Sequence, residues 1–527
     1  MTLKRLLIFS LILWLLPGCD LLSNDQPDNP AAQFDVNRNS AIYLRGGQPR
    51  TLDPARTHEA PSSALGHIFS GLVTLDQDLQ VQPDLAAGWT VSEDGTLYTF
   101  YLRKNALFHD GRPVTAQDIV YSWERATDPT IGSDTAHTYL GDIVGVDERL
   151  GGTADTIAGL HVIDEHTLEV RLEAPVIYFL AKLAYPVAFV VDRENVAQAD
   201  WEHQPNGTGP FRLQVWQDDD IMVLARHNAF YAEPAQVEHL VILMGPGLSL
   251  AMYEQDELDM VGIGGDALAR AQDPNNSLSA ELHMVVDMCT STIGLNNQIP
   301  PFDDERVRQA FNYALDKEQL IEIFSNGNGL VARGALPPGM PGFSYDLVGY
   351  PYDPERARQL LAEHGEVPPL TFVMAGYDDV DAYTTAVITM WQENLGVTIE
   401  PILIDPFIFL DELYGGHTGH IFSSGWCADF PDPQNFLDVL YHSQSQQNLS
   451  GFADPDVDQL LEKARVERNS TARMALYQEA ERLIVAEAPV VFVSHSVSAV
   501  LVKPRLQNYV LTPIGITQWH RVSINNP

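Results

Sequence analysis

Three cysteines are the side chains of this chain with the widest choice of chemistry. Cys19 follows an apolar segment near the N-terminus, whereas Cys289 and Cys427 lie far from it in the sequence. In an oxidising compartment Cys289 and Cys427 would form a disulfide that closes a long loop; the alternative is two separate buried thiols. The cysteines do not cluster as zinc ligands do, so the sequence predicts no metal at them.

Motifs of the common hydrolases and nucleotide-binding proteins are missing from the sequence, which has no His-Glu-x-x-His, Gly-x-Ser-x-Gly or Gly-x-x-x-x-Gly-Lys. His417 and His420 are spaced to meet on a helix and bind a metal, but Gly415, Gly416 and Gly419 favour a loop. The sequence therefore predicts a protein without enzymatic activity, cofactor or metal. A peptidase whose catalytic residues are scattered along the chain stays open as an alternative.

The N-terminus predicts export and a lipid anchor. Lys4 and Arg5 precede an apolar run at residues 6–16 that is too short to cross a bilayer, as in a cleavable export signal. The run ends in Leu-Pro-Gly-Cys, which resembles a bacterial lipobox. This resemblance implies that residues 1–18 are a signal peptide and that Cys19 carries diacylglycerol. The alternative is an ordinary export signal with a chance cysteine.

The residues after Cys19 predict a tether in an acidic protein. Asp20 resembles the signal that retains lipoproteins on the periplasmic side of the inner membrane. Residues 19–37 are rich in Asn, Asp, Pro and Ala and predict a flexible segment. The net charge of −40 excludes nucleic acid as a partner. This charge suits saline surroundings, or else it favours cationic ligands.

Strands and helices alternate along the rest of the chain, which predicts a mixed α/β protein of two or more lobes. Capping residues mark the predicted starts of helices at Thr115, Asp303 or Asp304, Asp353 and Asp454, and a fifth helix is predicted from Thr471 to Glu487. Runs rich in β-branched and aromatic residues predict strands at 97–102, 369–373, 397–403, 490–493 and 499–502.

An ordered series of motifs resembles the oligopeptide and dipeptide family of ABC-transporter substrate-binding proteins over nearly the whole mature chain. The motifs are Thr-Leu-Asp-Pro at 51–54, Gly-Leu-Val at 71–73, Pro-Asp-Leu-Ala-Ala-Gly-Trp at 83–89, Phe-His-Asp-Gly-Arg-Pro-Val-Thr-Ala-Gln-Asp at 108–118, Gly-Thr-Gly-Pro-Phe at 207–211, Arg-Val-Arg-Gln-Ala at 306–310 and Leu-Val-Lys-Pro at 501–504. Within this series, we interpret His109 and Asp110 as residues of lobe structure.

The resemblance implies a two-lobed periplasmic-binding-protein fold (type II, cluster C) with a subdomain inserted in the first lobe. The implied division is lobe I at residues 38–69, 200–287 and 498–527, the inserted subdomain at 70–199, and lobe II at 288–497. The implied function is capture of peptides, chiefly oligopeptides, by a monomer that delivers them to an inner-membrane permease and its ATPases. Alternative cargoes on the same scaffold are a nickel complex, haem or an oligosaccharide.

The segment Gly425-Trp426-Cys427-Ala428-Asp429 resembles the ligand-contacting loop of oligopeptide binders. The resemblance implies that Asp429 pairs with the α-ammonium group of the peptide and that Cys427 forms a disulfide with Cys289. It also places these five residues at the ligand. Taken by pattern alone, Asp429 is a turn residue and Trp426 a core residue.

Two further residues near this loop leave alternatives open. Asp432 is a second candidate for the ammonium partner. Ser423 stands where oligopeptide binders often have a basic residue, so the resemblance does not supply a partner for the peptide carboxylate.

Overall fold

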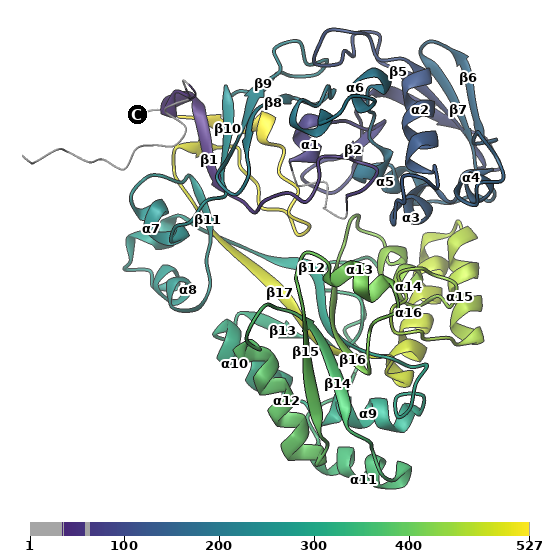
Figure 1. Cartoon of the computed structure of the whole chain (residues 1–527), viewed down its shortest axis with the longest axis vertical. Coiled ribbons are helices and arrows are strands. Elements are labelled where there is room, and N and C mark those ends of the chain that lie inside the picture. The colour runs from purple at the N-terminus through teal and green to yellow at the C-terminus, as the bar shows by residue number, and fades with distance from the viewer. Residues whose placement is uncertain (1–33, 35, 58–63, 526–527) are drawn as a thin grey trace, which may run out of the picture.

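The computed structural model describes residues 34, 36–57 and 64–525, which form two α/β lobes, one above the other in Figure 1. We use "upper lobe" for residues 36–243 and "lower lobe" for residues 296–489. The predicted signal peptide, Cys19 and all but a few residues of the predicted tether lie outside the described residues. The predicted mixed α/β class is confirmed. Within the described part of the chain, no helix is long and apolar enough to cross a membrane.

Two four-stranded sheets and a hairpin build the upper lobe. One sheet has the order β1-β10-β9-β8, with β1 Ala41–Arg45, β8 Phe211–Gln217, β9 Ile221–Arg226 and β10 His239–Leu243. The second has the order β4-β5-β7-β6, with β4 Ala86–Val91, β5 Leu97–Leu102, β6 Leu160–Asp164 and β7 Thr167–Arg171. The hairpin pairs β2 Val73–Leu75 with β3 Val81–Pro83. Strand β5 has the bounds that its aromatic and β-branched residues predict.

The upper lobe also contains short helices: α1 Leu65–Ile68, α2 Ala116–Ala126, α3 Ala136–Leu140, α4 Val146–Leu150, α5 Phe179–Lys182 and α6 Arg193–Val196. Helix α2 begins after Thr115 as predicted, because Thr115 and Asp118 form a capping box. Its Trp123 is fully buried and donates its indole N–H to the carbonyl of Ala188 at 2.9 Å. The residues at the capping box therefore determine where α2 begins. The packing of buried side chains such as Trp123 determines its orientation.

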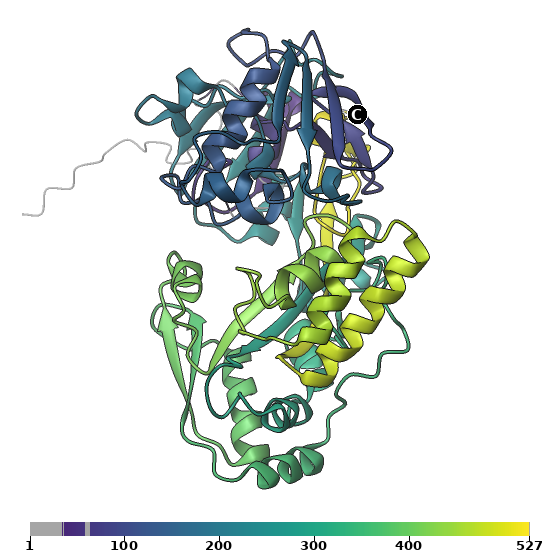
Figure 2. The same ribbon diagram turned by 90° about the vertical axis from the view of Figure 1, so that its right-hand side faces the viewer.

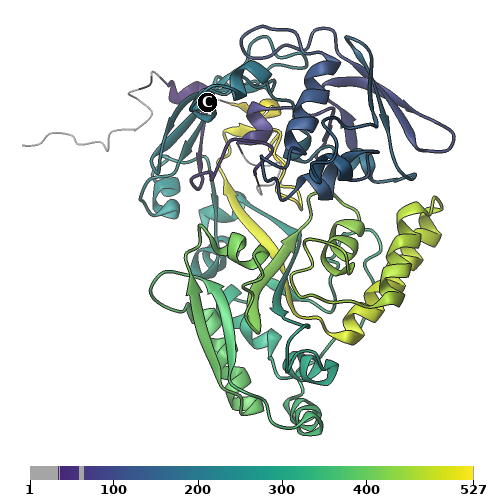
Figure 3. The same cartoon turned by 45° about the vertical axis from the view of Figure 1, so that its right-hand side comes forward.

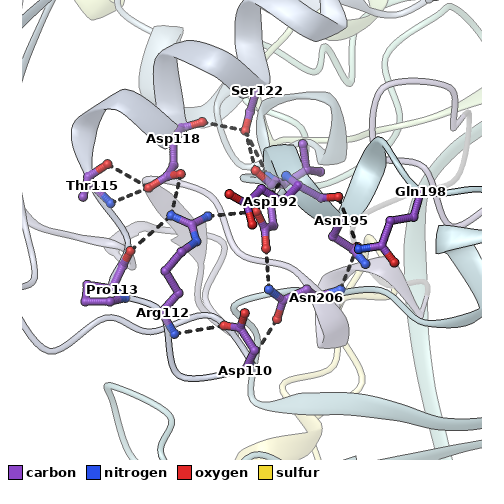
Figure 4. A network of polar contacts seen from close by, with 12 residues as sticks. Asp110, Arg112, Pro113, Thr115, Asp118, Ser122, Asp192, Asn195, Gln198 and Asn206 are labelled. Carbon is purple, nitrogen blue, oxygen red and sulfur yellow. Dashed lines mark hydrogen bonds and ion pairs between the residues drawn. The ribbon is translucent and has the colours of Figure 1, made fainter.

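A polar network explains why the segment around Asp110 and Arg112 is structural (Figure 4). The Arg112 guanidinium lies between two carboxylates, 2.9 Å from Asp118 and 3.1 Å from Asp192. Asn206 donates its side-chain N–H to Asp192 at 2.6 Å and accepts the backbone N–H of Asp110 at 3.0 Å. These contacts join the first turn of α2 to the approach to β8, which agrees with the interpretation of Asp110 as part of lobe structure.

A seven-stranded sheet forms the centre of the lower lobe and extends toward the upper one. Its order is β11-β17-β12-β16-β14-β15, with β13 on the side of β17. The strands are β11 Met260–Gly262, β12 Leu282–Leu295, β13 Gly329–Val331, β14 Leu370–Ala375, β15 Ile399–Ile404, β16 Ile421–Cys427 and β17 Val490–Val502. The long strands β12 and β17 run between the two lobes (Figures 1 and 3). Helices α7 Ser249–Glu254 and α8 Gly265–Gln272 lie near their upper end.

The prediction of two separate strands at 490–493 and 499–502 is wrong, because both belong to β17. Ser494, Ser496 and Ser498 interrupt the apolar run between them. These residues continue the strand because β12 pairs with one side of it and β13 with the other. Residues 490–502 form one strand because of this pairing with other strands, which the local sequence does not show.

Helices cover both faces of the lower sheet: α9 Glu305–Tyr313, α10 Lys317–Ser325, α11 Pro354–His364, α12 Ala382–Leu395, α13 Phe409–Tyr414, α14 Gln434–Tyr441, α15 Pro455–Val466 and α16 Ser470–Glu487. Asp304, Asp353 and Asp454 cap α9, α11 and α15 as predicted. Helix α16 begins one residue earlier than predicted, because Asn469 caps it. A C-terminal hairpin pairs β18 Leu506–Gln507 with β19 Ser523–Ile524.

The two lobes touch each other at several polar contacts. Arg468, in the turn between α15 and α16, donates to the carbonyls of Glu93 at 3.0 Å and of Asp94 in the upper lobe. Arg50 donates to the carbonyl of Phe407 and lies 3.7 Å from Asp411. The arrangement is therefore one in which the lobes face each other closely (Figure 2). The division into lobe I, inserted subdomain and lobe II at the stated residues stays a prediction.

Candidate ligand-binding site

A cavity of about 550 Å³ lies between the two lobes. Four residues of the upper lobe line it: Thr135, Thr138, Tyr139 and Tyr185. Most of its wall comes from the lower lobe, with side chains of β12, β16, α13 and α14. Cavities of this size between two lobes are typical places for small ligands.

The segment predicted to contact the ligand lies at this cavity. Gly425, Trp426 and Cys427 end strand β16, and all three line the cavity together with Asp429. Ala428 is buried instead, and its N–H donates to the carbonyl of Met288 at 2.8 Å. The structure thus brings four of the five residues to the cavity wall, while Ala428 fastens the segment to the neighbouring strand.

The half-buried carboxylate of Asp429 is held from both lobes. Its Oδ2 accepts the hydroxyl proton of Tyr139 from α3 and a side-chain N–H of Asn435 from α14, the latter at 3.2 Å. The backbone N–H of Asp429 donates to Asn435 Oδ1 at 2.8 Å. No described residue donates to Oδ1 of Asp429. One carboxylate oxygen is therefore positioned by the protein, and the other is open to a donor in the cavity.

Burial raises the pKa of the Asp429 carboxyl to about 6, although the hydrogen bonds from Tyr139 and Asn435 lower it. Burial, with the nearby Asp429 as a second cause, also raises the pKa of Tyr139 well above its ordinary value, so its hydroxyl keeps its proton and donates. A cation placed near Asp429 would favour the ionised carboxylate. The electrostatics of the site therefore favour a positively charged group of the ligand beside Asp429.

Cys289 and Cys427 form a disulfide between β12 and β16. The two cysteines are direct partners in the antiparallel register of these strands, with a Cα–Cα distance of 4.0 Å. The crosslink closes a sequence separation of 138 residues, two residues before Asp429. It therefore limits the movement of the segment that carries the carboxylate.

The alternatives for Trp426 and Asp432 have different outcomes. Trp426 is half-buried, lines the cavity and packs against the core of α14–α16, and its contact with a ligand stays a prediction. Asp432 accepts two hydrogen bonds from the buried guanidinium of Arg473, at 2.7 and 2.6 Å, and is not part of the cavity wall. The geometry therefore favours Asp429 over Asp432 as the partner of a ligand cation.

The outer edge of β16 is open beside the cavity. Strand β12 pairs with β16 along Ile421–Cys427, but β14 pairs only with Ile421 and Phe422 on the other side. Among the described strands, none pairs with this second side of β16 from Ser423 onward. Its backbone N–H and C=O groups can accept an added extended chain.

Sequence reasoning missed Tyr139 and Asn435, the two residues that hold the Asp429 carboxylate. Tyr139 lies in the other lobe, in a short helix whose sequence carries no motif for this contact. Its ring stacks on Tyr185 with the centroids 3.8 Å apart. Asn435 is fully buried and follows Asp429 by six residues. An Asn so close to an acid and at the start of a helix was the signal in the sequence that could have indicated this contact.

His417 and His420 do not converge on a metal site. His417 lies in a loop and pairs with Glu412 at 2.6 Å, while His420 hydrogen-bonds to Thr371 at 2.8 Å. Within the described residues, no three His, Cys, Asp or Glu side chains are grouped so that they could hold a metal ion. The loop predicted from the glycines around these histidines is confirmed.

Comparison with known proteins identifies what this chain resembles. The family model of bacterial extracellular solute-binding proteins, family 5, matches residues 80–448. The periplasmic oligopeptide-binding protein OppA of Escherichia coli is 31% identical over 503 residues, which cover 92% of each chain. Heme-binding protein A of Haemophilus influenzae is 27% identical over the full length of both chains.

Two solved structures of one protein add information on the arrangement of the lobes. The murein tripeptide binding protein MppA of Escherichia coli is 25% identical and matches 92% of this chain and 98% of its own with a TM-score of 0.81. Its unliganded open form covers 93% of this chain and 98% of its own with a TM-score of only 0.68. This chain therefore has the two-lobed fold and matches the first of these structures better than the open form. It belongs to the family 5 bacterial extracellular solute-binding proteins.

Proposed function

We propose that this protein binds peptides between its lobes for an ABC importer and that Asp429 accepts the α-ammonium group of the peptide. The main support is the position of the Asp429 carboxylate in the cavity between the lobes. Its Oδ2 accepts hydrogen bonds from two protein donors, whereas its Oδ1 accepts none from the described residues. An ammonium group supplies donors that fit Oδ1. In a cavity closed to bulk water, such a charge-assisted hydrogen bond is stronger than at an exposed surface.

The open edge of β16 supports an extended peptide as the cargo. A peptide that adds along Ser423–Cys427 pairs its backbone with backbone groups of the protein, and these contacts do not depend on the peptide sequence. Its first residue then lies beside Asp429 and the ring of Trp426. The similarity to the oligopeptide-binding protein of Escherichia coli favours oligopeptides over dipeptides.

Other cargoes are weaker candidates. The relative named Heme-binding protein A is the reason to consider haem. A nickel complex or haem iron would call for ligating side chains at the cavity, and His417 and His420 both pair elsewhere. A neutral oligosaccharide carries no positive charge to pair with the Asp429 carboxylate. The peptide therefore accounts for more of the geometry.

The N-terminal sequence supports a proposed cellular setting. Export by residues 1–18 and a lipid anchor on Cys19 would hold the protein at the periplasmic face of the inner membrane. There it would act as a monomer that hands its peptide to a permease driven by ATPases. Mass spectrometry of the mature N-terminal peptide from a membrane fraction would show the diacylglycerol on Cys19, and an unmodified cysteine would contradict the anchor.

Isothermal calorimetry with purified protein and a peptide mixture tests the proposed function. We expect binding of peptides with a free amino group and at least about tenfold weaker binding of their N-acetylated forms, since one charge-assisted hydrogen bond contributes about 1.5–3 kcal/mol. Asp429→Asn keeps the shape of the side chain and should weaken the binding of peptides with a free amino group by the same factor. Asp432→Asn is the matched control and should bind normally. Equal affinity for free and acetylated peptides would refute the role of Asp429.

The same incubation separates binding from cleavage. Mass spectrometry of the peptide mixture after incubation should show intact peptides with the protein. New fragments that depend on the protein would support the peptidase alternative instead.

A further inference from the structure

A second cavity of about 510 Å³ adjoins the cavity at Asp429. Thr292 of β12 and Ser423 and Ser424 of β16 belong to the walls of both cavities. A ligand anchored at Asp429 that extends along β16 past Ser423 therefore enters the second cavity. The end of such a ligand that is remote from its amino group would lie there.

Neutral hydrogen-bonding groups dominate the polar part of the second cavity. Hydroxyl and amide side chains in its wall are Ser291, Thr292, Ser325, Asn328, Tyr383, Thr384, Ser423, Ser424, Ser494 and Ser496. Thr292 and Ser424 already hydrogen-bond to each other at 2.6 Å, and Ser496 donates to Asp287 at 2.9 Å. The wall can thus donate to and accept from a neutral polar group without carrying a charge itself.

The charged groups at this cavity are unsuited to an anion. Asp381 stands in its wall and accepts the N–H and the hydroxyl of Thr384, at 2.9 and 2.6 Å, as the cap of α12. Burial lowers the pKa of His495 to about 4, so this imidazole is neutral at pH 7. Among the described residues that line the two cavities, none is Lys or Arg.

We propose that the second cavity takes an uncharged end of the ligand and selects against a free carboxylate, so that the preferred cargo is a peptide with a free amino end and a neutral carboxyl end. A carboxylate that leaves water without a cation beside it loses hydration and gains little in return. A carboxamide brings both donors and an acceptor to a wall of hydroxyl groups. The inference rests on the proposed function, because it assumes that the amino end lies at Asp429.

Pairs of peptides that differ only at the carboxyl end test the proposal. Calorimetry would compare the free acid with the amide for peptides of three, four and five residues. We expect the amide to bind about fivefold more tightly at the length whose end lies in the second cavity, the effect of one unfavourable charge interaction in a partly solvated site. Free acids that bind as tightly as amides, or more tightly, at every length would overturn it. If neither form binds, the proposed function itself fails.

A gain of carboxylate recognition provides the second test. Ser423→Arg places a guanidinium between the two cavities and should reverse the preference, so that the free acid binds better than the amide. Thr471→Arg is the matched control, because Thr471 is exposed on α16 and outside both cavities. The control should keep the preference for the amide. A ratio of acid to amide affinity that Ser423→Arg leaves unchanged would show that the carboxyl end lies elsewhere.

Discussion

The hydroxyl of Tyr139 in the upper lobe donates a hydrogen bond to the carboxylate of Asp429 in the lower lobe. The two residues lie 290 positions apart in the chain, and both line the cavity between the lobes. A ligand cation at Asp429 would therefore lie beside α3 of the upper lobe and the end of β16 of the lower lobe. This contact links closure of the lobes to the group that we propose binds the ligand.

Peptide affinity should depend on pH through Asp429. The pKa of this carboxyl is raised to about 6 in the unliganded protein, while the proposed ion pair needs the ionised form. Affinity should then be constant above about pH 7 and fall by up to about tenfold per pH unit below 6. Calorimetry between pH 5 and 8 measures this dependence. Asp429→Asn should abolish the slope, and a wild-type affinity that does not change across this range would contradict the assignment.

Ionisation of Asp429 should lower the stability of the unliganded protein, although it raises the affinity for peptide. Because its folded pKa lies above the ordinary value of 3.8, the ionised carboxylate costs stability, and this cost grows as pH rises from about 4 to 6. Without ligand, Asp429→Asn should therefore unfold at a higher temperature than the wild type at pH 8. The difference should shrink at pH 4. Thermal unfolding of both proteins at the two pH values measures this.

Asp432 should be a residue of stability and not of binding. Arg473 is buried and donates two hydrogen bonds to Asp432. Asp432→Ala leaves this guanidinium without its partner and should reduce the free energy of unfolding by about 3 kcal/mol. Chemical denaturation measures the loss, and peptide affinity of the folded fraction should stay within about twofold of the wild type. A large loss of affinity without a loss of stability would return Asp432 to the candidates for the ammonium partner.

Removal of the disulfide should affect both stability and binding. The double variant Cys289→Ser, Cys427→Ser frees a loop of 138 residues in the unfolded chain and should lose about 2–4 kcal/mol of stability. Peptide affinity should also fall, because the segment before Asp429 gains freedom. Alkylation of the wild-type protein should label Cys289 and Cys427 only after reduction. Labelling without a reductant would show that the pair is not crosslinked in solution.

Arg468 should stabilise the closed arrangement of the lobes. It donates to the carbonyls of Glu93 and Asp94 across the gap between them and does not line the ligand cavity. Arg468→Ala should weaken peptide binding about fivefold, as expected for the loss of about 1 kcal/mol from the closed state. Small-angle X-ray scattering should show a larger radius of gyration for the unliganded variant.

Arg482→Ala provides the control for Arg468→Ala. Arg482 is exposed on α16, and its ion-pair partner is the neighbouring Glu479 of the same helix. This variant should bind peptide like the wild type and keep its radius of gyration. If the two variants have the same peptide affinity and the same radius of gyration, Arg468 does not hold the lobes together.

The sequence by itself determined the features that depend on near neighbours. Asp304, Asp353 and Asp454 cap their helices because a capping side chain reaches only the next turn. Strand β5 has the predicted bounds because its content of β-branched and aromatic residues and its flanking turns are local. The motifs also identified the family, since their order along the chain is itself a property of the sequence.

Only the tertiary structure decided which residues meet across the chain. Tyr139 and Asp429 come together through the packing of two lobes, and Asp432 is paired with Arg473 because α16 lies beside that turn. The position of Ser423 in the walls of both cavities likewise depends on the order of strands in one sheet. Such contacts arise from the global arrangement of elements, so no pattern within a short segment of this chain contains them.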